Sequence, residues 1–133
     1  MRLLAFLLVF LSVPALAYHE GHDGIAPEIQ AWFARQKQPD SDPVHPASCC
    51  GDYDAYEADL FEKNGDQFVA IITNGKDDIP AGTRVIIPPQ KMPQDNHDPN
   101  PSGHGIVFMS IYRDADNVAH PGVVYCYFYP FLG

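Results

Sequence analysis

The amino-acid sequence predicts a small, mainly β protein with one N-terminal helix. Two patterns support this fold class: apolar segments with a strand period alternate with Asn, Gly and Pro after residue 55, and a helical period precedes them. The chain has 133 residues, enough for one domain with a modest core. We expect a small curled antiparallel sheet or partly open barrel of about five strands, with the helix across one face or plugging one end.

The helix is expected to begin near Pro27, because proline suits the first turn, and to end before Gln38-Pro39. Its apolar residues form one stripe: Ile25, Ile29, Trp32 and Phe33. Residues 39–48 carry three prolines and are expected to form an extended connector.

The strands are expected at residues 56–60, 67–73, 83–87, 105–112 and 123–129. Asn64-Gly65 supplies the turn residues of a tight hairpin between the first two. Further turns are expected at 74–75, 79–82 and 114–117. Residues 88–103 contain five prolines and no period, so we expect a long loop there.

The last expected strand has two different faces. Simple alternation places Val124, Cys126 and Phe128 on one face, and Val123, Tyr125, Tyr127 and Tyr129 on the other. Cys126 then lies on the more apolar face. We therefore expect it to be buried in a structural disulfide.

The chain contains three cysteines, Cys49, Cys50 and Cys126. A disulfide between the adjacent Cys49 and Cys50 would close a strained ring, so we expect Cys126 to pair with one of them. The closed loop of about 75 residues contributes on the order of 4 kcal/mol in the chain-entropy model. The sequence leaves open which of the two pairs, and whether the remaining thiol is buried or exposed.

Residues 1–17 have the pattern of a secretory signal peptide. A positive start precedes an apolar run over 3–13, and small residues end the segment at Ala17. The run is shorter than the ~20 residues of a membrane-spanning helix. We expect a flexible mature N-terminus over 18–24, a single disulfide-stapled β domain over 25–133, a periplasmic or secreted location, and no stable membrane span after cleavage.

Acidic residues dominate the charge of the chain. It has 17 Asp and Glu against 8 Lys and Arg, which gives a net charge of −9. Such a chain is repelled by nucleic acids and by anionic lipid surfaces. Neither is therefore an expected partner.

Four segments occur in a specific order: 48–56 (SCCGDYDAY), 79–85 (IPAGTRV), 100–108 (NPSGHGIVF) and 124–127 (VYCY). In these motifs, and in the pair Trp32-Phe33, the chain resembles a family of small exported proteins of alphaproteobacteria, some from phage-related contexts, with no established activity. The resemblance covers most of the mature chain and implies an envelope or secreted location and a shared fold. It implies no catalytic residues. Some relatives carry an additional cysteine after the Cys-Cys pair, and its replacement here implies that a second disulfide is absent.

A thiol hydrolase is one alternative function. Cys49 or Cys50, together with His104 and Asp54, are the parts of a Cys-His active site, and residues 103–108 look like the histidine strand of NlpC-type cell-wall peptidases. The chain departs from those enzymes around the cysteines, where the sequence is acidic and turn-like. Neighbouring aspartates raise the pKa of a thiol, whereas a nucleophile needs it lowered. We therefore expect no catalytic residues.

Metal handling is a second alternative. His19, Glu20, His22 and Asp23 form a cluster that suits Zn²⁺, Cu²⁺ or Ni²⁺, of which the two histidines and Asp23 are weak candidate ligands. A flexible tail binds weakly because ordering it opposes binding, so no metal or other cofactor is expected. The acidic run Asp52, Asp54, Glu57 and Asp59 lacks the EF-hand spacing for Ca²⁺ and is expected to be solvated.

The C-terminal aromatic residues are the candidate binding surface: Tyr125, Tyr127, Tyr129 and Phe131. Aromatic side chains on one strand face can bind a sugar or a partner chain. The same face can instead form core beneath the helix that carries Trp32 and Phe33. Both readings stay open at this point.

The sequence thus favours a non-catalytic exported binding or structural module of the cell envelope. Its partner is expected to be an envelope protein or a glycan. The thiol hydrolase, and weak metal handling through the N-terminal histidines, are the alternatives.

Overall fold

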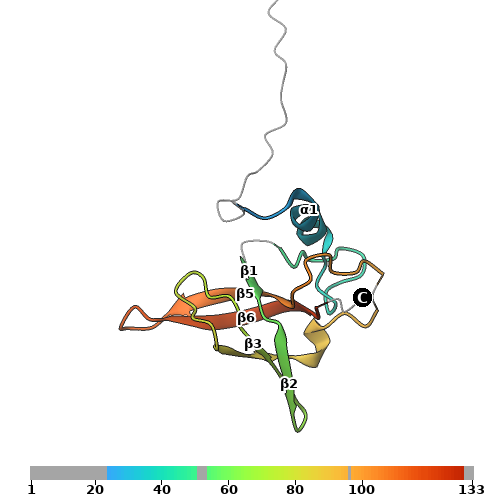
Figure 1. Ribbon diagram of the computed structural model, residues 1–133. Coiled ribbons are helices and arrows are strands. Elements are labelled where there is room, and N and C mark those ends of the chain that lie inside the picture. The colour runs from blue at the N-terminus through green and yellow to red at the C-terminus, as the bar shows by residue number, and fades with distance from the viewer. Residues whose placement is uncertain (1–23, 51–53, 96, 131–133) are drawn as a thin grey trace, which may run out of the picture.

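A computed structural model describes residues 24–50, 54–95 and 97–130 (Figure 1). Its elements are α1 (Pro27–Arg35), β1 (Asp54–Glu57), β2 (Leu60–Asn64), β3 (Gln67–Ile71), β4 (Arg84–Ile87), the 3₁₀ helix η1 (Pro89–Lys91), β5 (Ile106–Arg113) and β6 (Ala119–Phe128). The strands form two antiparallel three-stranded sheets, with the orders β1-β5-β6 and β2-β3-β4. The predicted mainly β fold with one N-terminal helix is confirmed, and the structure adds that six strands are divided between two sheets.

Helix α1 packs its apolar stripe against the sheet β1-β5-β6 (Figure 1). It begins at Pro27, as expected, and the chain becomes extended at Gln36, just before the predicted end. The ring of Trp32 lies edge-on to Phe128 with centroids 4.8 Å apart, and the ring of Phe33 lies edge-on to Phe108 at 5.2 Å. Among the residues that the structure describes, no helix is long and apolar enough to cross a membrane.

The segment predicted as one strand over 56–60 is divided between the two sheets. Strand β1 ends at Glu57 and β2 begins at Leu60, so the chain passes from one sheet to the other through Ala58 and Asp59. The N–H of Ala58 donates a hydrogen bond of 2.7 Å to the carbonyl of Gly105. This non-local contact is invisible in the alternating pattern, and it explains why the prediction of one continuous strand was wrong.

Both tight hairpins form close to their predicted turns. Asn64 pairs with Gln67 across the β2–β3 hairpin, and Gly65 has φ +62°, the left-handed conformation that glycine adopts readily. The β5–β6 hairpin turns at residues 114–117, at the left of Figure 1. Strand β6 begins at Ala119, before the predicted start, and tolerates Pro121 because it is an edge strand.

An irregularity in β6 changes the predicted faces of this strand. Phe108 pairs with Cys126 but the next residue, Met109, pairs with Val124, so Tyr125 is an additional residue on β6. Val124 consequently shares a cluster with Tyr127, not with Cys126. The prediction of simple alternation was therefore wrong, because a bulge shifts every side chain beyond it to the other face.

The sheet β1-β5-β6 lies between two apolar clusters. One fills the space between the sheets, and its members include Tyr56, Ala70, Ile72, Val85, Ile87, Val107, Met109 and Tyr127. The other lies beneath α1 and consists of Trp32, Phe33, Cys49, Ile106, Phe108 and Cys126. Alternate residues of β5 thus face the second sheet or the helix, as the period of two requires.

A disulfide joins Cys49 to Cys126 across 77 positions of the chain, and both residues are fully buried. It ties the connector that follows α1 to the edge strand β6. The expected pairing is therefore confirmed for Cys126, and the open choice is resolved in favour of Cys49. Cys50 is a free, half-buried thiol.

Candidate functional site

A groove of about 500 Å³ lies between the N-terminal half of α1 and strand β1. Its apolar lining consists of Ile25, Ala26, Ile29, Phe33, Ala55 and Ile106, and its polar lining consists of Glu57, Asn74, Lys76, Ser102 and His104, with Gly24 at one end. An apolar concavity with a few convergent polar groups is the usual form of a ligand site. A second cavity of about 380 Å³, between residues 36–39 and 93–98, is lined mainly by polar loop residues.

The apolar floor of the groove comes from α1 with the residues just before it, and from the sheet β1-β5-β6. The stripe on α1 continues towards the helix N-terminus at Ile25 and Ile29, and both side chains remain half-buried. On the sheet, Ala55 of β1 and Ile106 of β5 face the helix, while Tyr56 faces the other sheet. The helix therefore presents more apolar surface than the sheet covers, and the groove is what remains open.

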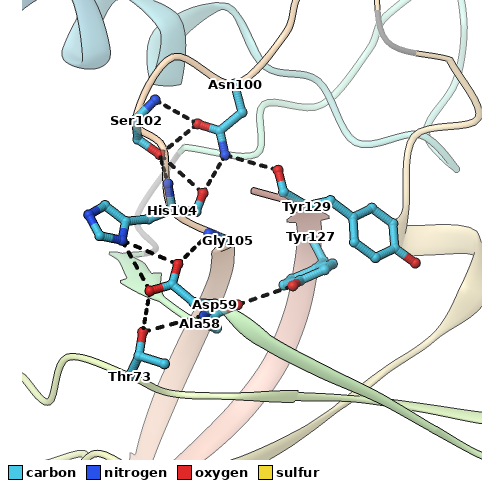
Figure 2. Close-up of polar contacts among 9 residues, drawn as sticks. All are labelled: Ala58, Asp59, Thr73, Asn100, Ser102, His104, Gly105, Tyr127 and Tyr129. Atoms are coloured by element: carbon cyan, nitrogen blue, oxygen red, sulfur yellow. Dashed lines mark hydrogen bonds and ion pairs between the residues drawn. The ribbon is translucent and has the colours of Figure 1, made fainter. Parts of the chain in front are cut away.

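The carboxylate of Asp59 binds three groups, one of which is the lining residue His104 (Figure 2). Its Oδ1 accepts a hydrogen bond of 2.7 Å from the N–H of Gly105, and its Oδ2 accepts one of 3.0 Å from the hydroxyl of Thr73. The Nδ1 of His104 lies 3.1 and 3.2 Å from the two oxygens. Burial disfavours the charged form, but the hydrogen bonds from His104, Gly105 and Thr73 outweigh it and hold the pKa of Asp59 below its ordinary value.

The imidazole of His104 is half-exposed and belongs to both the Asp59 cluster and the groove lining. Its hydrogen bond to Asp59 raises the pKa of His104, which burial partly opposes and the negative charges of Glu57 and Asp59 reinforce. The charge of this histidine is thus set by two carboxylates beside the groove.

The segment 100–105 holds His104 in this position (Figure 2). The buried amide of Asn100 donates to the carbonyls of His104, at 2.6 Å, and Tyr129, at 3.3 Å. Its Oδ1 accepts hydrogen bonds from both the N–H and the hydroxyl of Ser102. A Cβ on Gly105 would lie 2.2 Å from the carbonyl oxygen of Ala58, so only glycine fits there. The motif at 100–105 therefore has a structural explanation.

Lys76 also lines the groove. Its Nζ lies 2.8 Å from a carboxylate oxygen of Asp54, 4.0 Å from Asp77 and 4.9 Å from the centre of the Tyr56 ring. Burial disfavours the charged form of Asp54, but Lys76 holds the pKa of Asp54 below its ordinary value. The turn that carries Lys76 has left-handed conformations at Asp77 and Asp78, with φ +53° and +65°.

The residues proposed for a thiol hydrolase have other partners in the structure. Cys49 is bonded to Cys126 and has no thiol. Burial, together with the charge of Asp54, raises the pKa of the Cys50 thiol. Asp54 binds Lys76, and the Nδ1 of His104 binds Asp59.

The weak candidate metal ligands and part of the acidic run cannot be placed. His19, His22 and Asp23, as well as Asp52, lie outside the described residues. Within 24–50, 54–95 and 97–130, no group of three or more His, Cys, Asp or Glu side chains is arranged to hold a metal ion. In the acidic run, Asp54 and Asp59 have different partners.

The C-terminal aromatic residues do not lie on one exposed face. Tyr127 is fully buried between the sheets, and its hydroxyl donates to the carbonyl of Ala58 at 3.1 Å (Figure 2). Tyr125 packs against the cluster beneath α1, whereas Tyr129 is half-exposed and contacts the ring of Phe61. Phe131 lies outside the described residues. The bulge at Tyr125 and the packing of Phe61 account for this arrangement.

The groove was not predicted from the sequence, although some of its residues were noticed. His104 was selected as a catalytic candidate and Ile29 as part of the helical stripe, but neither pattern connects them. The sequence did not predict that Lys76 lines the groove. A comparison of the chain with protein-family models, with curated proteins and with solved structures finds no match.

Proposed function

We propose that this chain is a non-catalytic exported binding module of the cell envelope, and that the groove between α1 and β1 is its ligand site. The observation that carries the proposal is the groove itself, because it combines an apolar floor with polar side chains from three separate segments on its rim. Three of these polar side chains, those of Lys76, Ser102 and His104, are held by hydrogen bonds or ion pairs before any ligand arrives. Such preorganisation reduces the entropy cost of binding.

Export is supported by two independent features. Residues 1–17 have the pattern of a signal peptide. The buried disulfide between Cys49 and Cys126 is a feature of proteins that work in oxidising compartments. A periplasmic or secreted location accommodates both.

A non-catalytic role is supported by the state of the cysteines and of His104. The disulfide removes one nucleophile, and burial and Asp54 disfavour the thiolate of Cys50. His104 is oriented by Asp59 at the groove rim, where it can take part in recognition.

The site can be tested with a neutral apolar probe, N-acetyl-leucine amide, by NMR titration of the oxidised protein. We expect amide shift changes at residues that line the groove, such as Ala55 and Ile106. Asn74→Trp, an exposed rim position, should block the groove and abolish these changes, whereas Gln67→Trp on the exposed part of β3 should not. Shift changes confined to other surfaces would contradict the proposed site.

A further inference from the structure

We propose that the groove binds a segment of another exported polypeptide in which an apolar side chain lies next to a lysine or arginine. The inference rests on the proposed function, because it names the ligand class of the same groove. Three features carry it: the apolar floor, the carboxylates around it, and the charge of the chain itself.

The floor of the groove requires an apolar group in the ligand. Ile25, Ile29 and Ile106 leave apolar surface open in a space of about 500 Å³. Burying such surface removes it from water, which favours binding. A compact, strongly hydrated cation gains nothing from this floor, whereas a leucine-like side chain does.

The charges around the groove favour a cation. The carboxylate of Glu57 belongs to the groove lining, and three further carboxylates, those of Asp54, Asp59 and Asp77, lie against the two basic lining residues, Lys76 and His104. Both basic groups are already engaged: Lys76 lies 2.8 Å from Asp54, and His104 lies 3.1 Å from Asp59. Among the described residues, Glu57 of β1 forms no direct ion pair and acts on His104 only through its charge, so its carboxylate oxygens can still accept a cation from a ligand.

The N-terminus of α1 does not reverse this field. A helix N-terminus carries a partial positive charge, but Glu28 lies in the first turn of α1 and offsets it. The negative charge of Glu57 therefore outweighs the partial positive charge of the helix N-terminus at the groove.

Charge also distinguishes three candidate ligands for the groove: the chain's own N-terminus, a second copy of the chain, and a different polypeptide. Residues 18–23 of the chain contain Glu20 and Asp23 but no lysine or arginine, so the acidic groove disfavours them. A second copy carries the same net charge of −9 and is repelled as a whole. A cationic segment of a different polypeptide is complementary in both charge and polarity.

The test compares three probes that differ in one side chain: N-acetyl-Leu-Lys amide, N-acetyl-Leu-Gln amide and N-acetyl-Leu-Glu amide. At low ionic strength we expect the lysine peptide to bind about fivefold more tightly than the glutamine peptide, and the glutamate peptide to bind most weakly. Glu57→Gln should abolish the preference for lysine, and added salt should reduce it. Glu62→Gln on β2 is the matched control, because Glu62 is exposed and pairs with Arg84.

Each contrary outcome has its own meaning. Equal affinity for the lysine and glutamine peptides, with shift changes still at the groove, would overturn this inference and leave the proposed function standing. Putrescine binding as tightly as the lysine peptide would contradict a peptide ligand. A uniform gain in affinity for all three peptides on deletion of residues 18–23 would make the chain's own N-terminus the occupant. No binding of any peptide, and none of N-acetyl-leucine amide, would contradict the proposed function itself.

Discussion

The carboxylate of Asp59 accepts a hydrogen bond of 2.7 Å from the backbone N–H of Gly105. This contact joins the passage between the two sheets to the residue before β5, next to His104, which lines the groove. The same carboxylate holds the hydroxyl of Thr73 and the ring of His104 (Figure 2). One side chain therefore links the stability of the fold to the shape of the groove rim.

Replacing Asp59 by Asn should lower the free energy of unfolding by about 1–2 kcal/mol. The amide keeps the size of the side chain but loses the charge that strengthens the hydrogen bonds from Gly105 and Thr73. Urea denaturation measures the change. Asp66→Asn, at an exposed position of the β2–β3 turn, is the control and should leave stability unchanged. Equal effects of the two substitutions would contradict the role given to Asp59.

Gly105→Ala should be much more destabilising than Gly65→Ala. At Gly105 the new Cβ would meet the Ala58 carbonyl oxygen at 2.2 Å, so the strands must separate, at a cost of about 3 kcal/mol. At Gly65 nothing lies within 4 Å, and the cost is that of φ +62° alone, about 1 kcal/mol. Thermal unfolding of the two variants checks the order, and the reverse order would be inconsistent with the packing at Gly105.

Cys49→Ser and Cys50→Ser should differ, although the two positions are adjacent. Loss of Cys49 opens the disulfide to Cys126, and the chain-entropy model gives a loss of about 4 kcal/mol. Loss of Cys50 removes only a half-buried thiol and should cost less than about 1 kcal/mol. Denaturation of both variants under oxidising conditions separates them, with the reduced wild-type protein as reference. Equal stability of the two variants would show that the pairing is exchangeable.

The His104–Asp59 pair should make stability depend on pH. The pKa of His104 is raised above 6.5. The contribution of His104 to the free energy of unfolding is therefore fully present below pH 6.5 and is lost as the pH rises through the folded-state pKa. The pKa of Asp59 is lowered below 3.8, so its contribution is present above pH 3.8 and is lost as the pH falls through the folded-state pKa. The contribution of the pair to the free energy of unfolding should thus be greatest between pH 3.8 and pH 6.5. It should be no more than about 1 kcal/mol, because the ring is half-exposed.

The measurement is the difference in unfolding free energy between the wild type and His104→Gln as a function of pH. We expect this difference to shrink above the pKa of His104. The same comparison in the Asp59→Asn background is the control, because the ring then lacks its carboxylate partner, and it should show a flatter profile. A difference that grows as the pH rises would contradict the assigned charge of the pair.

Features that depend on neighbouring residues could be predicted from the sequence. The start of α1 at Pro27 follows from proline chemistry, and the β2–β3 hairpin follows from the positive φ of Gly65. The burial of Cys126 follows from the apolar character of its strand. In the first two cases the decisive interaction lies within a few positions of the chain.

Features that depend on distant residues could not be predicted. The break after Glu57 requires Ala58 to bond with Gly105, and the bulge at Tyr125 requires knowledge of the register with β5. The sequence identified His104 as chemically interesting, but its partner Asp59 is 45 positions away. The groove arises only when α1 is placed over β1, so no single motif could identify it.

The most direct test of the groove as a ligand site is the measurement of intermolecular NOEs between the leucine methyl groups of N-acetyl-Leu-Lys amide and the methyl groups of the protein. We predict NOEs to Ile29 and Ile106, which line the groove. Leu60 and Ile86, each 57% exposed on the sheet β2-β3-β4, provide an alternative apolar surface. NOEs to Leu60 and Ile86 in place of Ile29 and Ile106 would contradict the account.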